Sequence, residues 1–153
     1  TETAEQIQAG IIGVVEDAYR NEVGFKPSAK EFIMTLYAAG VPMTVVTSND
    51  RPLVEAAFER LQIRLYFQEI ITCGEFGSGK DHPDIFYEAA KRMGSSISNI
   101  WVAEDGLYAM RTAKKEGFRI IGMADVSSRD DEAQIRQLAD YFLTDYADDV
   151  TNL

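Results

Sequence analysis

Short, continuous runs of apolar residues alternate with longer amphipathic segments along most of the chain. The runs are rich in β-branched and large side chains, which is typical of parallel strands covered on both faces. They lie at 43–47, 69–72, 99–103 and 119–123, with a weaker run at 141–143. Helical patterns lie between them, at 52–61, 83–93, 107–116 and 130–138. This alternation predicts an α/β fold with a parallel sheet, right-handed crossovers and helices on both faces.

Two further helical patterns precede the first of these runs. In 3–20, apolar residues recur at spacings of three and four, as on one face of a helix. After a break at 21–27, Ser28 is expected to cap a second helix with Glu31 as its reciprocal partner. Left-handed glycine caps are expected at three helix ends: Gly40, Gly94 and Gly117.

Composition narrows the class of protein. The 153 residues are 46% hydrophobic and 26% charged, which is enough apolar material for one packed domain. Their net charge of −10 opposes binding to nucleic acids and to anionic membranes. Cys73 is the only cysteine, so the chain can form neither an internal disulfide nor a cysteine-based metal site. These features favour a cytoplasmic protein whose ligands are small or cationic.

Polar residues that could carry chemistry follow three of the four strong apolar runs. They are, in chain order, Thr47, Ser48 and Asn49; Lys80 in a glycine-containing loop; and the acid pair Glu104 and Asp105. Because ligands of open parallel sheets bind outside the carboxyl ends of the strands, these residues are expected at one edge. Hydroxyl and amide donors can bind phosphate oxygens, a lysine can neutralise their charge, and carboxylates can hold Mg²⁺.

Each of these pieces also has an ordinary structural explanation. Thr47 and Ser48 could simply cap a helix, and Lys80 could be a surface lysine. Glu104 with Asp105 could start a helix that its macrodipole favours. Their order and their placement after successive strands favour a joint site.

The same segments resemble the haloacid dehalogenase-like hydrolase family, in particular its β-phosphoglucomutase and phosphoglycolate phosphatase branch. The matching segments are 39–49, 79–86 and 101–118, in the family's order and strand contexts. The resemblance covers about 28–149 and implies a Rossmann-like core. It also implies a Mg²⁺-dependent phosphate-monoester hydrolase or phosphomutase that acts on a small phosphorylated metabolite through an aspartyl-phosphate.

The resemblance assigns roles to individual residues. Thr47 is similar to the family's phosphate-binding hydroxyl, with Ser48 and Asn49 adding contacts. Lys80 is similar to the lysine that steadies the nucleophile and the transferring phosphoryl group. Asp105 is similar to the Mg²⁺ ligand, with Glu104 binding the metal directly or through a neighbouring ligand. On this resemblance Lys80 and Thr47 are the catalytic residues of this chain.

Three positions depart modestly from the family pattern. Asp81 stands where a proline is common, Gly106 where a serine often follows the acid pair, and Ala109 where a glycine is usual. Asp81 could pair with Lys80 and weaken its hold on phosphate.

One departure is large, because the family's nucleophile has no counterpart upstream of Thr47. That nucleophile is the first aspartate of an Asp-x-Asp motif at the end of the first strand. Asp17 lies inside a helical pattern, and the acids in 145–148 have the wrong spacing. In this family the missing strand lies between the strands that end at Thr47 and Ala103. Its absence predicts a gap in the sheet with unpaired backbone groups on both sides.

Two accounts of the chain follow from that departure. In the first, it is an inactive fragment, in which 1–24 is the remnant of a helical cap and 25–153 is the α/β core. In the second, it is a short protein that binds phosphate or another ligand without catalysis.

A nucleotide-binding P-loop is a further alternative. The segment 74–80 begins like one and follows a predicted strand. However, Asp81 stands where a serine or threonine must reach Mg²⁺, and Pro83 delays the helix that should start at the lysine. His82 and Cys73 are most simply a surface loop residue and a small buried residue, respectively.

Overall fold

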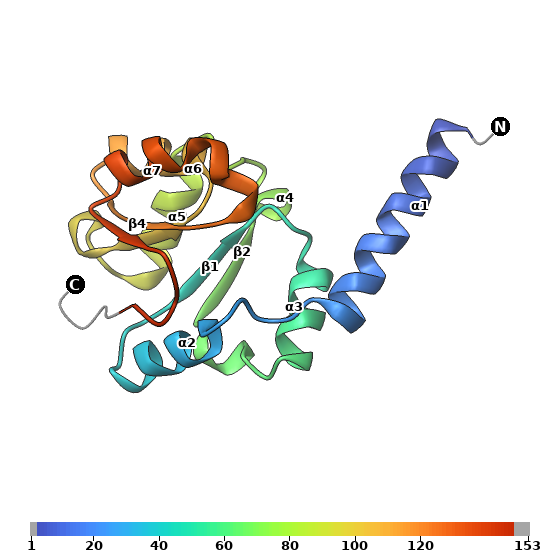
Figure 1. Ribbon diagram of the computed structural model, residues 1–153, viewed down its shortest axis with the longest axis horizontal. Coiled ribbons are helices and arrows are strands. Elements are labelled where there is room, and N and C mark those ends of the chain that lie inside the picture. The colour runs from blue at the N-terminus through green and yellow to red at the C-terminus, as the bar shows by residue number, and fades with distance from the viewer. Residues whose placement is uncertain (1–2, 149–153) are drawn as a thin grey trace.

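The computed structural model describes residues 3–148 and has a Rossmann-like α/β architecture (Figure 1). Its strands are β1 (Thr44–Thr47), β2 (Glu69–Thr72), β3 (Trp101–Glu104), β4 (Arg119–Met123) and β5 (Tyr141–Leu143). All pairings are parallel, as the uninterrupted apolar runs predict. The strands form two sheets, β1-β2 and β3-β4-β5. The sheet is therefore divided between β1 and β3, where the family resemblance predicts a gap.

Helices alternate with these strands. The α-helices are α1 (Ala4–Asp17), α2 (Ala29–Ala38), α3 (Arg51–Arg60), α4 (Cys73–Phe76), α5 (Asp84–Met93), α6 (Leu107–Lys115) and α7 (Glu132–Leu138). Short turns lie at η1 (Ala18–Glu22, a π-helix), η2 (Arg64–Tyr66), η3 (Ile97–Asn99) and η4 (Val126–Asp131). The end of the resembling segment, Asp149, lies outside the described residues.

Most element boundaries match the sequence pattern, and the exceptions have local causes. The predicted cap at Ser28 is wrong: its φ is +60°, and its side chain makes no capping hydrogen bond. Instead, its carbonyl accepts a hydrogen bond from the Phe32 amide. The segment 73–82, expected to be a loop, begins with α4, where the Thr72 hydroxyl accepts a hydrogen bond from the Glu75 amide. The three predicted glycine caps do have positive φ: Gly40, Gly94 and Gly117.

One hydrophobic core spans both sheets. Ile85 and Phe86 of α5, Met110 of α6 and Ile120 of β4 are buried in one cluster. Val46 of β1 packs against the same cluster. The helices α5 and α6 thus hold the two sheets together although no backbone hydrogen bonds join β1 to β3 within residues 3–148.

The helix α1 projects away from the rest of the chain (Figure 1). Its side chains Ile11 and Val14 are 60% and 71% exposed. Such exposure is unusual for aliphatic residues on an amphipathic helix, which normally packs on a core. The body of the fold and its site therefore depend little on α1.

Candidate functional site

A buried ion pair joins the two sheets at their carboxyl ends. Lys80 lies in the loop after β2, and Glu104 is the last residue of β3. The Lys80 Nζ is 2.7 Å from Glu104 Oε2, and the two side chains are only 13% and 10% exposed. The predicted neighbours Lys80 and Glu104 therefore do meet, from different sheets.

The pair keeps both of its members charged. Burial opposes the charge on Lys80, but the nearby Glu104 carboxylate outweighs it and raises the pKa of the ammonium. Burial likewise opposes the charge on Glu104, but Lys80 and the Gly106 amide outweigh it and lower the pKa of that carboxyl. The alternative that Asp81 neutralises Lys80 is wrong, because Asp81 lies instead 3.6 Å from His82 Nε2 on the exposed loop.

Gly106 permits the conformation of Glu104. The second oxygen of Glu104, Oε1, accepts a hydrogen bond of 2.9 Å from the Gly106 amide. A Cβ atom at Gly106 would lie 3.1 Å both from that oxygen and from the Tyr108 ring, which is closer than most side chains allow. Gly106, where a serine is common in the family, therefore leaves space for the Glu104 carboxylate, which bends back to the amide of Gly106.

Asp105 lies next to this pair in a different environment. It is half-buried, and burial together with its neighbour Glu104 raises the pKa of its carboxyl. The Lys26 ammonium acts in the opposite direction. Lys26 pairs directly with Asp125, and the half-buried Tyr146 lies within electrostatic reach of this group.

Sequence reasoning did not identify this second group around Asp105. Lys26 and Asp125 are 99 residues apart in the chain, so no periodic pattern connects them. Lys26 lies in the segment 21–27 that interrupts the helical pattern. Only the folded chain shows that this lysine lies within electrostatic reach of Asp105, a proposed metal ligand.

The other half of the site lies at the end of β1. The Asn49 amide donates a hydrogen bond of 3.1 Å to the Thr47 hydroxyl. The Ser48 hydroxyl lies 3.6 Å from the Cys73 sulfur. These groups stand just before α3, whose first amides and dipole favour an anion. Thr47, Ser48 and Asn49 therefore lie together at the end of β1, and their role in binding phosphate stays a prediction.

Tyr19 connects this half of the site to the N-terminal segment. The Asn49 side-chain amide donates a hydrogen bond of 2.7 Å to the Tyr19 hydroxyl. Tyr19 belongs to η1, and the backbone carbonyls of Tyr19 and of Val23, the residue after η1, accept hydrogen bonds from Arg60 of α3. The turn after α1 is therefore held next to Asn49. Tyr19 and Asn49 are 30 residues apart, and no sequence pattern predicts their contact.

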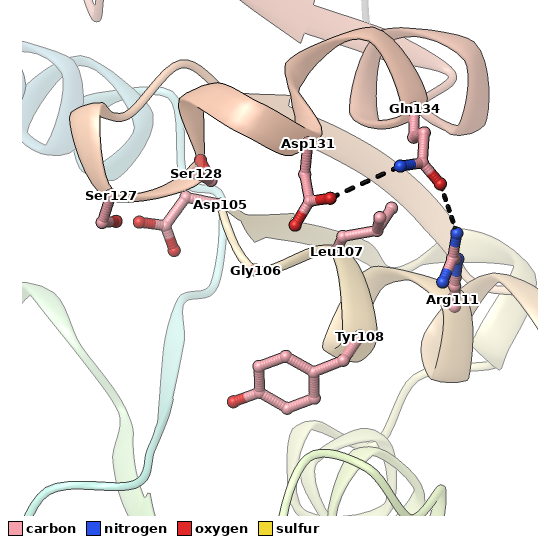
Figure 2. A pocket seen from close by; sticks show the side chains of 9 residues that line it. All are labelled: Asp105, Gly106, Leu107, Tyr108, Arg111, Ser127, Ser128, Asp131 and Gln134. Carbon is pink, nitrogen blue, oxygen red and sulfur yellow. Dashed lines mark hydrogen bonds between the residues drawn. The ribbon is translucent and has the colours of Figure 1, made fainter.

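A pocket of about 350 Å³ adjoins Asp105 between α6 and the segment formed by η4 and α7 (Figure 2). Asp105 points into one end, next to Ser127 and Ser128, and Arg111 stands at the other end. Arg111 donates a hydrogen bond of 2.6 Å to Gln134. The lining is Asp105, Gly106, Leu107, Tyr108, Arg111, Ser127, Ser128, Asp131 and Gln134. This polar pocket has room for a small molecule beside Asp105.

The residues present fit part of a Mg²⁺ site. Within residues 3–148, no group of three or more histidine, cysteine, aspartate or glutamate side chains could hold a metal ion. Asp105 offers one carboxylate, and Glu104 is engaged by Lys80. Mg²⁺ commonly binds one or two carboxylates and keeps several water molecules or substrate phosphates. Asp105 with Glu104 beside it thus fits a shared site that other ligands must complete.

The P-loop alternative is wrong. A P-loop runs directly into the helix that begins at its lysine. Here α4 occupies Cys73–Phe76 inside the glycine-containing segment, and α5 begins only at Asp84. Lys80 is held by Glu104 of β3. His82 is exposed, and Cys73 is half-buried against the core, close to their expected roles.

None of the helices in the described part of the chain is both long and apolar enough to span a membrane.

Comparisons with known proteins agree on one family. The family model for haloacid dehalogenase-like hydrolases matches residues 2–123. The phosphoglycolate phosphatase of Escherichia coli K12 is 28% identical over 121 residues, which are 76% of this chain and 48% of that protein. The chain therefore spans about half the length of the curated relatives it matches.

Solved structures show the same fold. A Thermotoga maritima protein described as a β-phosphoglucomutase aligns with a TM-score of 0.80 at 18% identity, over 94% of this chain and 66% of that one. CbbY from Rhodobacter sphaeroides, in complex with phosphate, aligns with a TM-score of 0.78 at 26% identity, over 95% and 64%.

Proposed function

Because this chain belongs to the haloacid dehalogenase-like hydrolase family, we propose that it forms the core of a phosphate-monoester hydrolase or phosphomutase. The observation that carries this proposal is the Lys80–Glu104 pair, which places a buried ammonium beside Asp105 at the carboxyl ends of both sheets. A small phosphorylated metabolite is the proposed substrate. The names of the relatives support this class, since one is a phosphoglycolate phosphatase and another is CbbY in complex with phosphate.

In this proposal the chain's own residues bind and orient the phosphoryl group. The hydroxyls of Thr47 and Ser48 and the amide of Asn49 would donate hydrogen bonds to its oxygens, aided by the N-terminus of α3. Lys80 would balance the negative charge on the same group. Glu104 acts on Lys80 rather than on substrate, because it holds the ammonium in place and keeps it charged.

Asp105 and Glu104 are the proposed Mg²⁺ ligands. Bound Mg²⁺ would offset charge on the phosphoryl oxygens during transfer. Asp105 suits this role because its half-buried carboxylate carries an electrostatic cost that a cation would relieve. Glu104 could contribute Oε1, the oxygen that Lys80 does not contact.

The nucleophile is the part of the mechanism that these residues do not supply. In the complete enzyme of this family, an aspartate would attack phosphorus and form an aspartyl-phosphate. No strand of the described residues ends in an Asp-x-Asp motif. We propose that 25–153 is the core and that 1–24 is the remnant of a helical cap, so that the chain alone is an inactive fragment. The cytoplasmic location expected from the sequence stays a prediction.

Calorimetry with inorganic phosphate and Mg²⁺ tests the proposed site. We expect wild-type chain to bind phosphate and Lys80→Ala to bind at least about tenfold more weakly, a change of about 1.4 kcal/mol. Lys91→Ala is the matched control, since the Lys91 side chain is 81% exposed and pairs only at 3.7 Å with Glu88. Circular dichroism of each variant separates a lost contact from a lost fold. Absence of phosphate binding to folded wild-type chain, or equal binding by folded Lys80→Ala, would contradict the proposal.

A non-catalytic phosphate-binding module is the second candidate. Two observations favour this candidate. The carboxylates of the described residues form only part of a metal site, and no described strand ends in the family's nucleophile motif. Both candidates predict no measurable turnover of p-nitrophenyl phosphate by this chain, because uncatalysed phosphate-monoester hydrolysis is extremely slow. Turnover that depends on Asp105 would show that the nucleophile is in this chain. The module is favoured if a native protein that begins at Thr1 binds phosphate without turnover.

A further inference from the structure

Asn49 connects two hydroxyl groups that come from distant parts of the chain. Its backbone amide donates a hydrogen bond of 3.1 Å to the Thr47 hydroxyl, and its side-chain amide donates one of 2.7 Å to the Tyr19 hydroxyl. Thr47 ends β1, whereas Tyr19 belongs to η1. The Tyr19 hydroxyl, from the N-terminal segment, therefore lies at the predicted phosphate-binding residues.

Both hydroxyl groups keep a hydrogen to donate. A hydroxyl carries one hydrogen and can also accept hydrogen bonds. Toward Asn49 both oxygens act as acceptors, so neither bond uses the hydrogen of the hydroxyl itself. Within residues 3–148, neither hydroxyl donates a hydrogen bond to another protein group. Thr47 and Tyr19 therefore each have one O–H group available for a ligand.

The backbone around Tyr19 is fixed to α3, the helix that follows Asn49. The Arg60 guanidinium of α3 donates hydrogen bonds to the carbonyls of Tyr19 and Val23. The Val23 amide donates a hydrogen bond of 2.8 Å to the Ala18 carbonyl, five residues earlier, as in a π-helix. π-Helical turns are rare and occur frequently at functional sites. Because these contacts do not involve the phenol, a change of the Tyr19 hydroxyl should leave the backbone in place.

Tyr19 also differs from the helix that precedes it. The end of α1 leads into η1 beside α3 (Figure 1). The Ile11 and Val14 side chains of α1 are mostly exposed, whereas Tyr19 is half-buried. Most of α1 thus projects from the fold, but the turn after it places one polar side chain at the site.

We propose that Tyr19 is a substrate-contacting residue, whose hydroxyl donates a hydrogen bond to a phosphoryl oxygen beside the hydrogen bond from Thr47. This inference rests on the proposed function, and it adds a residue from the N-terminal segment to that site. Tyrosine hydroxyls that are fixed in place can stabilise oxyanions by donating hydrogen bonds. A phosphoryl group offers several acceptor oxygens, so two neighbouring O–H donors suit it.

Asn49 is a positioning residue for both hydroxyls in this arrangement. It donates to the oxygens of Thr47 and Tyr19 and so leaves their hydrogens for the ligand. Its side-chain amide carries a second hydrogen. Asn49 can therefore orient Tyr19 and still donate to the phosphate of the proposed function.

The alternative is that Tyr19 only anchors the N-terminal segment to the core. The hydrogen bond to Tyr19 would then compete with phosphate for the Asn49 side chain, and loss of the hydroxyl would free that side chain. Tyr19→Phe removes only the hydroxyl oxygen. The proposal predicts weaker phosphate binding by this variant, whereas the alternative predicts equal or stronger binding.

Calorimetry with inorganic phosphate and Mg²⁺ compares wild type, Tyr19→Phe and Tyr37→Phe. We expect Tyr19→Phe to bind phosphate about tenfold more weakly, as for the loss of one hydrogen bond to a charged group. Tyr37→Phe is the matched control and should bind as wild type does, because Tyr37 lies on α2, is 49% exposed and packs its ring on Tyr66. Circular dichroism shows whether each variant keeps its fold.

Fluorine NMR of chain labelled with 3-fluorotyrosine separates contact with phosphate from structural support. The Tyr19 resonance is identified by its absence from the spectrum of Tyr19→Phe. We expect it to shift as phosphate is added, with the dissociation constant that calorimetry gives, while the Tyr37 resonance stays fixed. Asn49→Ala removes the donor that orients the phenol, so Tyr19→Phe should weaken phosphate binding less in that background than in wild type.

The outcomes separate this inference from the proposed function. Absence of phosphate binding to folded wild-type chain would overturn both. Binding that is weakened in Lys80→Ala but is unchanged or stronger in folded Tyr19→Phe would overturn this inference alone. A Tyr19 resonance that does not shift at saturating phosphate, or an equal loss of affinity in Tyr37→Phe, would also overturn it.

Discussion

The two sheets contain similar parallel strands, but they differ in how completely they are built. The β3-β4-β5 sheet has a central strand whose Ile120 is fully buried, and its Gly122 is packed so closely that a Cβ would lie 2.9 Å from Ile135. Within residues 3–148, the β1-β2 sheet has two strands, a size that is marginal without further support. One sheet is a finished part of the core, whereas the other depends on its neighbours.

Their chemistry differs in the same way. The β1 end carries the Thr47 hydroxyl and the Asn49 amides, which donate hydrogen bonds to Thr47 and Tyr19 and which the proposed function assigns to an anion. The β3 end presents the carboxylates Glu104 and Asp105, which suit a cation, with Lys80 reaching across from the loop after β2. In the proposed function, a phosphate with Mg²⁺ would contact both halves. A site that draws residues from both sheets therefore depends on the less completely packed sheet, β1-β2.

The largest expected effect tests the difference in packing. Ile120→Ala should lower the free energy of unfolding by about 3–5 kcal/mol, because it empties a fully buried position in the central strand. Val45→Ala in the half-buried β1 should cost about 1 kcal/mol. Urea unfolding of the two variants measures both values. Equal losses in the free energy of unfolding would mean that β1 and β4 are packed equally well in the core.

The second effect tests the ion pair that joins the sheets. Lys80→Met leaves Glu104 buried without its partner and should cost about 2–3 kcal/mol, somewhat less than for a fully enclosed pair. Glu104→Gln in the same background should recover part of this loss, because it removes the unpaired charge. Urea unfolding of the single and double variants gives the coupling. A loss below about 0.5 kcal/mol for Lys80→Met would place this pair among ordinary surface ion pairs.

The pH dependence of stability sharpens the same point. The pKa of Glu104 is lowered in the folded state, so its contribution is present above its unfolded value and is lost as pH falls through the folded value. The pKa of Lys80 is raised, so its contribution is present below its unfolded value and is lost only as pH rises through the higher folded one. Wild-type stability should therefore fall in acid more steeply than that of Glu104→Gln, measured by urea midpoints from pH 3 to pH 7.

The smallest effect separates function from stability at the β3 end. Asp105→Asn should raise stability at neutral pH by less than about 1 kcal/mol, because burial and Glu104 disfavour the charged form. The same variant should weaken Mg²⁺-dependent phosphate binding in calorimetry. A loss of stability would show that Asp105 is held by favourable contacts and is not kept for a cation.

Strand positions were the most predictable part of the fold. The runs 69–72, 119–123 and 141–143 coincide with β2, β4 and β5, because continuous apolar runs in this context have few alternatives. Local chemistry was less predictable at Ser28, which has a positive φ and makes no side-chain capping hydrogen bond. The break between β1 and β3 followed from the family resemblance and not from hydrophobic periodicity.

The positions of the candidate residues were predictable from the sequence, but their contacts were not. Thr47 and Glu104 end β1 and β3, Asp105 follows β3, and Lys80 lies in the loop between α4 and α5. Their roles stay predictions. Their partners depend on tertiary structure: Glu104 rather than Asp81 for Lys80, and Lys26 near Asp105. Such contacts join segments dozens of residues apart, where neither spacing nor propensity carries information.

A double-mutant cycle on phosphate affinity tests most directly whether the two sheets share one ligand. Calorimetry with phosphate and Mg²⁺ would compare wild type, Thr47→Val, Lys80→Ala and the double variant. If both residues bind the same phosphate, each single variant weakens binding and the two losses are coupled by about 0.5 kcal/mol or more. Losses that simply add, or a Thr47→Val variant that binds as wild type does, would contradict a site shared between β1 and β3.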